Sequence, residues 1–446
     1  MKIPPQPPEF NLTKHPPERW MKIISLVRLP TVGGRYLHWD KLRNLPIPES
    51  LKELNREEWW FGLKLSRRAL QREVPLTDIN DKAFTVALVD PVLEILQRLD
   101  SRAGGVVLSP DEGINSAMRD RYLVRSLTEE AITSSQLEGA ATTREVAKQM
   151  LRSGRPPRDV SEQMILNNYR AMQKIRQIKD QPLTPEIILD LHRILAAETF
   201  ENPDAVGRWR KTEEEIRVED EYGEVLHTPP PADQLARRMQ SLCDFANGKT
   251  PNNFVHPVLR AIILHFWLAY DHPFFDGNGR CARALFYWSM LHNGYWLCEF
   301  VSISEVVRKA PIKYGRAFLY TETDENDLTY FVLYHLEVLQ KAIESLHAYI
   351  DRKAAEAREV ENQINLRADF NHRQLAILSH ALRHADAVYT ITEHQTSHGV
   401  VYQTARTDLL DLANRGLLKP TKRERGREIY FRPVPNLQRQ LSRTKE

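Results

Sequence analysis

Residues 272–283 read HPFFDGNGRCAR and lie between two strongly apolar segments. This short stretch combines a histidine, an aspartate, an asparagine, two glycines and two arginines. Asp-Gly-Asn-Gly is a turn sequence, and it leads into a helix that we expect to begin near Arg280. A polar loop between two buried helices predicts a mainly α-helical core with an anion site at a helix N-terminus.

The residue types of this loop suit a nucleotide. Gly277 and Gly279 permit a positive φ and a close backbone approach, so that successive N–H groups form a concave anion site together with Asn278. Arg280 and Arg283 are spaced i, i+3 and share one face of the helix. Two guanidinium groups beside such a site suit a polyphosphate better than a single carboxylate.

The remaining residues of the loop supply the other parts of a transfer site. Asp276 is a natural oxygen ligand for Mg²⁺, the usual companion of a nucleotide. His272 is the one group of the loop whose ordinary pKa suits proton abstraction near neutral pH. Phe274 and Phe275 would hold the loop to the core. Taken singly, a histidine, a turn or an arginine pair is usually structural, but their combination predicts transfer of part of a nucleotide to a hydroxyl.

Length and composition set the broad class of the protein. A chain of 446 residues suggests two or three domains. Hydrophobic residues make up 42% and charged residues 27%, which is typical of a folded soluble protein, and the net charge of +3 excludes no partner. Three cysteines lack metal-ligand spacing and indicate a reducing compartment. With no apolar run long enough to span a bilayer, we expect a cytoplasmic protein with no membrane partner.

Periodicity predicts helices over most of the chain and few strands. A Pro-rich arm is expected over 1–18, and the clearest strand signal is a hairpin around Glu221–Gly223. A charged helix over 327–358 is followed by a polar linker over 359–369. The helices expected before that one are 50–75, 91–105, 111–155, 160–178, 184–198, 233–247, 255–271 and 279–292.

The loop resembles the signature of the Fic family, H-x-F-x-[D/E]-G-N-G-R-x-x-R, at every specified position. Fic proteins are mostly adenylyltransferases, which move AMP from ATP to a Tyr, Thr or Ser hydroxyl of a target protein. The resemblance implies ATP as the substrate and Mg²⁺ as the cofactor. It implies that His272 is the base, that Asp276 is the metal ligand and that Phe274 anchors the loop. The phosphates would be bound by the cradle of Gly277, Asn278 and Gly279, by Arg280 at the β-phosphate and by Arg283 at the γ-phosphate. Gly279 stands where a kinase-type branch has lysine, which favours AMP transfer.

The same resemblance implies an inhibitory element. Residues 134–139 read SSQLEG and match the family's inhibitory motif, [S/T]-x-x-x-E-[G/N], through Ser134, Glu138 and Gly139. A carboxylate at a helix C-terminus is unfavourable by ~0.3–1 kcal/mol, and such exceptions occur at functional sites. In the family, this glutamate pairs with the second signature arginine, here Arg283, so we expect self-inhibition. Some members also use it to remove AMP.

The C-terminal tail has its own organisation. Helices expected over 372–384, 392–398 and 401–415 precede two strands around a basic turn, the order of a winged helix-turn-helix. Residues 371–446 carry thirteen Lys and Arg against seven Asp and Glu. Thr404, Arg406, Thr407 and Arg425 are the candidate DNA contacts. Such domains also serve protein interaction or dimerisation, and both alternatives stay open.

The expected fold is therefore mainly α: a Fic helical core with a small β-hairpin flap, and a C-terminal winged helix. The flap would bind a segment of a target protein at its exposed edge, although a hairpin of this kind is usually a surface feature. The expected parts are an N-terminal helical region (1–110), the Fic core (111–345) with inhibitory helix (123–139), flap (214–228) and signature (272–283), a helix end and linker (346–369), and the winged helix (370–446).

Three functions follow from this sequence. The first is an AMP-transferring enzyme restrained by Glu138, with AMP removal as a variant of it. The second is a transcriptional regulator that binds DNA through its tail, and a homodimer is a further expectation. The third is a scaffold that binds nucleotide without turnover, which the intact His272 and the complete phosphate cradle argue against.

Overall fold

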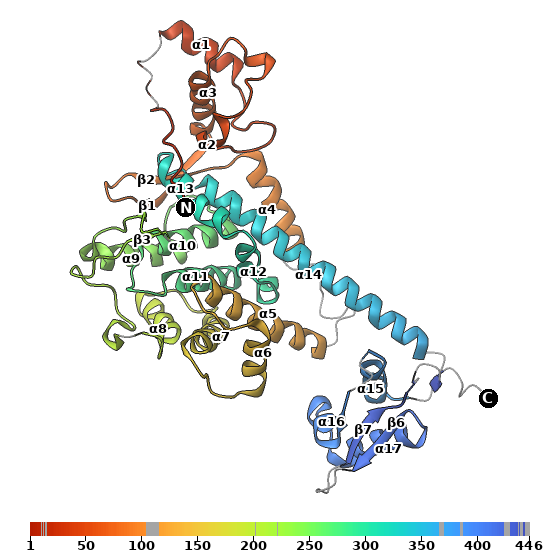
Figure 1. Cartoon of the computed structure of the whole chain (residues 1–446). Helices are drawn as coiled ribbons and strands as arrows, with labels where there is room; N and C mark the ends of the chain where they lie inside the picture. Colours follow the sequence, from red (N-terminus) through yellow and green to blue (C-terminus); the bar gives the residue numbers. More distant parts are fainter. Residues whose placement is uncertain are drawn as a thin grey trace. The chain divides into compact units, whose positions relative to one another are not determined.

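The structure of the protein is a computed structural model. It describes the chain except for residues 10, 12, 14–15, 104–115, 201, 221, 365–369, 384–386, 423–428, 436, 438–439 and 442–446. The chain forms two compact units, Met1–Leu346 and His347–Glu446 (Figure 1). The expected domain boundaries remain predictions, although the break between the two units falls next to the expected end of the core at residue 345.

The first unit is mainly helical. Its helices and strands are α1 (Pro17–Leu26), α2 (Trp39–Leu42), η2 (Glu49–Leu51), α3 (Arg56–Arg68), β1 (Gln71–Thr77), β2 (Ala83–Ala87), α4 (Asp90–Ala103), α5 (Ser116–Leu137), α6 (Arg144–Ser153), α7 (Val160–Ile178), α8 (Pro185–Ala196), η3 (Pro203–Ala205), β3 (Val218–Glu219), β4 (Val225–His227), η4 (Ala232–Gln234), α9 (Leu235–Ala246), α10 (Pro257–Asp271), α11 (Asn278–His292), η5 (Trp296–Phe300), α12 (Ile303–Arg308), α13 (Pro311–Thr323) and the first part of α14 (Thr329–Ile364).

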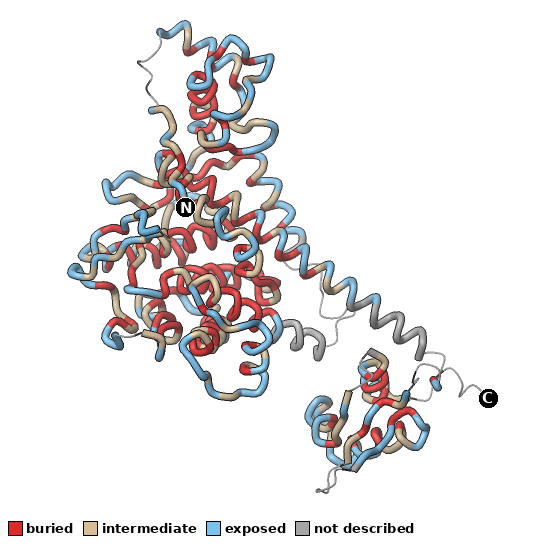
Figure 2. Tube along the Cα trace, viewed as in Figure 1, coloured by how far each residue is buried: buried red, intermediate tan, exposed pale blue. Residues whose placement is uncertain are grey.

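Helices α10 and α11 pack against each other at the centre of this unit and carry the loop 272–277 between them (Figure 1). Nearly every residue of α10 is buried, because its sequence is apolar all round, and Figure 2 shows buried residues along both helices. Pro257 opens α10 at a position that needs no N–H donor. The loop is therefore held on two buried helices, which gives the side chains of the site a rigid support.

The N-terminal region corrects one expectation. The helix expected over 50–75 is confined to α3, which begins with a capping box at Asn55 and Glu58, and the chain then forms the antiparallel hairpin β1–β2. Val74 and Leu76 are buried and alternate with more exposed neighbours, which is the period of a strand. Pro75 would also interrupt a helix.

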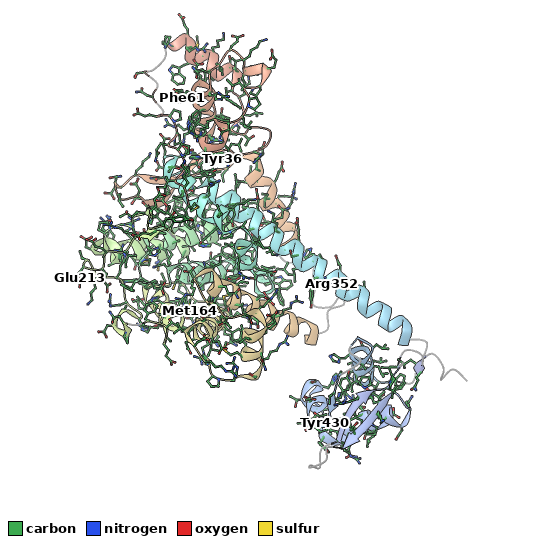
Figure 3. The ribbon with its side chains drawn as sticks, in the orientation of Figure 1. Tyr36, Phe61, Met164, Glu213, Arg352 and Tyr430 are labelled. Atoms are coloured by element: carbon green, nitrogen blue, oxygen red, sulfur yellow. The ribbon has the colours of Figure 1, made fainter. Side chains whose placement is uncertain are left out.

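Buried polar contacts connect the N-terminal helices to the segment between α13 and α14. The Lys64 ammonium lies 2.8 Å from the Asp324 carboxylate, and both side chains are almost fully buried. Arg67 donates to the Tyr330 hydroxyl at 3.0 Å and to the Leu37 carbonyl at 2.9 Å. An apolar cluster that includes Phe61, labelled in Figure 3, completes this region. The N-terminal region therefore packs against the rest of the first unit.

After the end of α14, the second unit consists of short helices and strands. These are α15 (His372–Arg383), β5 (Tyr389–Thr390), α16 (Ile391–His398), α17 (Tyr402–Asn414), β6 (Leu418–Lys422) and β7 (Ile429–Pro433), with the strands in the order β5-β7-β6. The three expected helices and the hairpin are all present, and assignment to the winged-helix class stays a prediction. The expected linker is shorter than predicted, because α14 continues to Ile364.

No helix among the residues that the structure describes has both the length and the apolar character needed to cross a membrane.

Candidate functional site

His272 ends helix α10 in an unusual backbone conformation. Its φ is 47° and its ψ is 55°, the left-handed region that a non-glycine residue seldom adopts. Arg210 stabilises this turn, since its Nε donates to the His272 carbonyl at 2.9 Å and its backbone N–H donates to the Pro273 carbonyl at 2.8 Å. Backbone strain of this kind is kept where the surrounding structure supports it and is common at functional sites.

The imidazole of His272 is prepared to accept a proton. Its Nδ1 lies 3.1 Å from the Ala269 carbonyl, so Nδ1 carries the hydrogen and donates it. The other nitrogen, Nε2, is then unprotonated, and the residue lines an open cleft. Burial lowers the pKa of His272 to about 4, which keeps the ring neutral at physiological pH.

The turn after His272 is closed by Asn278. Its Oδ1 accepts from the Phe274 N–H and its Nδ2 donates to the Phe274 carbonyl, both at 2.9 Å. Gly277, the N-cap of α11, has a φ of 82°, as expected of a glycine in this turn. The Asn278 side chain is thus engaged, and the Gly277 N–H donates to Asp276 Oδ1 at 2.6 Å, so the predicted cradle at 277–279 has the backbone N–H groups of Asn278 and Gly279 to offer. The first N–H groups of a helix have no intrahelical partner and can bind an anion.

Gly279 is needed for a different reason than the one predicted. It lies inside α11 and does not have a positive φ, so backbone conformation does not require glycine there. A Cβ at this position would lie 2.2 Å from Oε1 of Glu138 and 2.9 Å from its Cδ. The absence of a side chain is what lets Glu138 approach the start of α11.

His192, on α8, supports the loop and was not identified from the sequence. Its ring stacks on Phe274 with centroids 3.8 Å apart, and Phe274 is fully buried as expected of an anchor. The Gly207 N–H donates to Nδ1 at 3.0 Å, so Nε2 carries the hydrogen and donates to the Asp276 carbonyl at 3.0 Å. Burial lowers the pKa of His192 to about 4. Eighty residues separate it from the loop, so no local pattern could have revealed this role.

Arg280 and Asp276 meet at the entrance to α11. Arg280 is 1% exposed and donates to the Leu195 carbonyl at 3.0 Å, while its second terminal nitrogen lies 3.4 Å from Oδ2 of Asp276. Asp276 itself is 58% exposed and lines the cleft. No group of three or more metal-binding side chains occurs among the described residues. A single exposed carboxylate nevertheless fits Mg²⁺, which commonly binds proteins through one or two carboxylates and the phosphates of its substrate.

Arg283 joins the signature helix to the end of α5. Its Nε donates to Ser134 Oγ at 2.8 Å, and one terminal nitrogen donates both to the Ser134 carbonyl at 3.1 Å and to Glu138 Oε1 at 2.8 Å. Arg283 is 2% exposed, whereas Glu138 is 24% exposed. Helix α5 ends at Leu137, and Gly139 has a φ of 94°. The structure thus brings the two predicted motifs into direct contact across 145 residues of sequence.

The Glu138–Arg283 pair is an ion pair at neutral pH. Burial alone would raise the pKa of Glu138, but the charge and hydrogen bond of Arg283 outweigh it and lower the pKa. Arg283 shows the reciprocal balance. Burial alone would lower its pKa, but the negative charge and hydrogen bond of Glu138 outweigh burial, and the pKa is raised. The guanidinium predicted to bind a γ-phosphate is therefore occupied by a carboxylate of the same chain.

The cleft beside His272 has a volume of about 490 Å³ and is lined by Glu215, Ile216, Arg217, Glu219, His272, Phe275 and Asp276. The flap supplies the first four of these residues, and its strands β3 and β4 pair with each other in a short antiparallel ladder. His227 fastens β4 to the end of α10 through a contact of 2.7 Å between Nε2 and the Tyr270 carbonyl. The predicted hairpin is thus present, shorter than expected, and it borders the predicted base.

The candidate DNA contacts lie in the second unit. Arg406 and Thr407 are exposed on α17, whereas Thr404 is half-buried. Thr407 donates its hydroxyl hydrogen to the Gln403 carbonyl at 2.9 Å. Arg425, expected in the basic turn, lies outside the described residues.

Comparison with known proteins finds relatives of the part of the chain that contains this site. Residues 182–290 match the Fic/DOC family. A protein adenylyltransferase Fic from Nematostella vectensis is 26% identical over 207 residues, which are 45% of each chain. Another from Drosophila grimshawi is 33% identical over 113 residues, which are 25% of this chain and 21% of that protein. The chain spans less than half the length of these curated relatives.

A solved structure supports the fold. The crystal structure of a Fic family protein from Desulfovibrio desulfuricans aligns with a TM-score of 0.50 at 18% identity, covering 78% of this chain and 98% of that one. The similarity confirms the mainly helical Fic fold that the sequence predicted. Over residues 182–290, therefore, the chain matches the Fic/DOC family, and its fold is that of a Fic family protein.

Proposed function

We propose that this protein transfers AMP from ATP to a hydroxyl group of a protein and that Glu138 restrains the reaction. The observation that carries the proposal is the neutral His272, whose unprotonated Nε2 belongs to a residue lining an open cleft at the start of a phosphate-binding helix. The curated relatives that match the chain are named protein adenylyltransferases, which supports the same reaction.

The chemistry is a substitution at the α-phosphorus of ATP. The acceptor oxygen forms a bond to the α-phosphorus, the bond to the bridging oxygen of the β-phosphate breaks, and pyrophosphate leaves. Nε2 of His272 takes the proton of the attacking hydroxyl, because its lone pair is available in this tautomer. The hydrogen bond from Arg210 to the His272 carbonyl holds the main chain of His272, and with it the imidazole, in place for this transfer.

The phosphates would be bound by the start of α11. The backbone N–H groups of Asn278 and Gly279 and the Arg280 guanidinium would bind the first phosphates, and Arg283 would bind the terminal phosphate. Asp276 would hold Mg²⁺, which supplies charge neutralisation for the phosphates when bound. Donors fixed before the reaction need no rearrangement as negative charge develops.

Glu138 competes with the terminal phosphate for Arg283. Because both are anions, the guanidinium cannot serve them at the same time in its present hydrogen bonds. Nucleotide bound while Glu138 remains in place would lack this contact and would sit in a pose unsuited to transfer. We infer that activity requires Glu138 to leave Arg283.

The direct test measures transfer from ATP radiolabelled at the α-phosphorus, with Mg²⁺ present. Three proteins are compared: wild type, Glu138→Gly and Glu138→Gly/His272→Ala. Label should enter protein in the first variant and fall by about 10²–10⁴-fold in the second, because its base is lost. ATP labelled at the γ-phosphorus is the control and should leave no label. Binding of ATP without incorporation in every protein would exclude the transferase.

The same site suits removal of AMP, with Glu138 placing a water molecule beside the phosphodiester. The test is to isolate labelled protein, remove ATP, and follow release of label with and without Glu138. Release that depends on Glu138 would establish the reverse activity, whereas stable label in both proteins would exclude it.

We also propose that the second unit binds duplex DNA. The buried face of α17, with Ala405, Leu409 and Leu412, packs into this unit's core, which leaves Arg406 on the opposite, exposed side. Asp408 fixes the helix by accepting from Arg373 at 2.7 Å. A helix presented in this way beside a small three-stranded sheet is an arrangement suited to reading a major groove.

Fluorescence anisotropy of the full chain with a labelled random-sequence duplex tests this second function. Binding should weaken steeply as salt rises, and Arg406→Ala should reduce it. Absence of binding at low salt, or binding that Arg406→Ala leaves unchanged, would favour a protein-interaction role for the unit.

A further inference from the structure

The flap that borders the cleft is strongly acidic in a chain that is otherwise slightly basic. Residues 213–224 hold seven carboxylates and one basic side chain, Arg217, whereas the whole chain has a net charge of +3. Glu213, labelled in Figure 3, is among the exposed ones. A concentration of one charge beside a catalytic cleft affects which partners can approach it.

Not all of these carboxylates are available to a partner. Glu214 is bound by Arg208 through two contacts of 2.9 and 2.6 Å. Asp220 accepts from the backbone N–H groups of Tyr222 and Glu224 within the turn, at 2.9 and 3.0 Å. Asp220 is also paired with the N-terminal ammonium of Met1, so the charges of Glu214 and Asp220 are already matched, and only the remaining carboxylates can select a partner.

Glu215 and Glu219 face the cleft itself. Both line it together with His272, and Glu215 is 81% exposed. Arg217 is the one cation of the lining, and it lies 3.5 Å from Glu215 in a weak contact between two exposed side chains. The lining thus contains three carboxylates, including Asp276, against one guanidinium.

The backbone of the flap offers a place for an extended segment. Strand β3 pairs with β4 along one side, and in the described part of the chain no other strand pairs with β3. An added strand would gain main-chain hydrogen bonds there, and its side chains would alternate between the flap and the cleft. Phe275, expected to hold the loop to the core, is instead 49% exposed and lines the cleft, where it offers this segment an apolar contact.

We infer that the cleft selects a basic acceptor: a segment with Lys or Arg beside the hydroxyl that receives AMP, held by Glu215 and Glu219. The inference rests on the proposed function, because it assigns the acceptor class of the same site. A basic segment would complement the flap, whereas an acidic one would meet like charge from the flap and from the phosphates of ATP.

The test compares two short peptides that share a Tyr-Thr-Ser core and differ only in flanking residues, lysine in one and glutamate in the other. Both are offered to the Glu138→Gly protein with ATP labelled at the α-phosphorus, and dye-labelled copies are used to measure binding by anisotropy. The lysine peptide should be labelled and bound about tenfold better, and added salt should shrink this difference.

Charge reversal provides the matched variants. Glu215→Lys/Glu219→Lys, in the same background, should invert the preference and leave ATP affinity unchanged. Glu94→Lys, a reversal at a 65% exposed position on α4, should leave the preference as it was. Together these proteins separate an effect of the cleft from an effect of overall charge.

The outcomes separate this inference from the function on which it rests. If no protein, including the enzyme itself, acquires label, the proposed transfer fails. If label is transferred but both peptides react and bind equally, or neither peptide binds to a chain that labels itself, the basic acceptor is excluded. A preference that survives the double reversal would also overturn it.

Discussion

Two carboxylates on the same stretch of chain, Glu130 and Glu138, are both directed into the first unit but have different surroundings. Glu130 is 2% exposed and accepts from the hydroxyls of Tyr287, Ser302 and Ser304 at 2.9, 2.7 and 2.5 Å, and from the Ser304 N–H at 3.2 Å. It connects α5 to α11 and to the start of α12 through neutral donors.

Glu138 has fewer contacts but a charged partner. It lies just beyond the end of α5, is 24% exposed, and faces the guanidinium of Arg283. Under the proposed function a terminal phosphate would replace Glu138 at Arg283, whereas Glu130 is enclosed by its hydroxyl donors. The comparison teaches that a buried carboxylate with several neutral hydrogen-bond donors stabilises the fold. A partly exposed carboxylate with one cationic partner is the kind that is suited to regulating activity.

The largest expected effect comes from removing the accessible carboxylate. Glu138→Gly should raise initial rates of AMP transfer by about 10- to 100-fold, since a hydrogen bond to a charged group contributes ~1.5–3 kcal/mol. Glu138→Gln, which keeps the size but not the charge, should give a smaller rise. Equal rates in wild type and both variants, with ATP binding intact, would contradict the regulatory role.

Removing the enclosed carboxylate should instead weaken the fold. Glu130→Gln places an amide donor against hydroxyl and N–H donors, so the free energy of unfolding should fall by ~2 kcal/mol. Urea unfolding measures this loss, and transfer by the folded protein should change little. If this variant matched Glu138→Gly in activation without losing stability, the contrast between the two residues would be wrong.

A smaller effect is expected at Ser134, which shares Arg283 with Glu138. Ser134→Ala removes the hydroxyl that accepts from Arg283 Nε at 2.8 Å but leaves the carbonyl contact. Transfer should rise by about two- to fivefold, because one neutral acceptor contributes ~0.5–1 kcal/mol. Ser153→Ala, on the exposed end of α6, is the control and should have no effect on rates.

The smallest effect is a displaced pH profile. The pKa of His272 is lowered to about 4, so the base stays neutral and active well below the usual histidine range. The lowered pKa of Glu138 means that its ion pair forms above that pKa and is lost only as pH falls through it. Rates of Glu138→Gly should therefore be flat between about pH 6 and pH 8. A fall centred near pH 6.5 would show that His272 titrates normally.

Much of this molecule could be predicted from local sequence. The helices α7, α8, α10 and α11 match their expected ranges within a few residues, because apolar periodicity and capping residues act over one or two turns. The signature loop and the SSQLEG motif were recognisable for a similar reason: each is contiguous. The α3–β1 boundary was wrong, since the largely polar residues 66–73 at the junction carry too few apolar positions to mark the change from helical to strand period.

Contacts between distant segments depended on the fold. Nothing local in the sequence indicates that His192 stacks on Phe274 or that Glu130 meets α12. The expected pairing of Glu138 with Arg283 rested on family resemblance, and only the packing of α5 beside α11 explains how Gly279 makes room for it. Residue types and their local spacing therefore specified the chemistry of the site, while long-range packing determined which charges meet, which remain accessible, and which nitrogen of His272 is left to accept a proton.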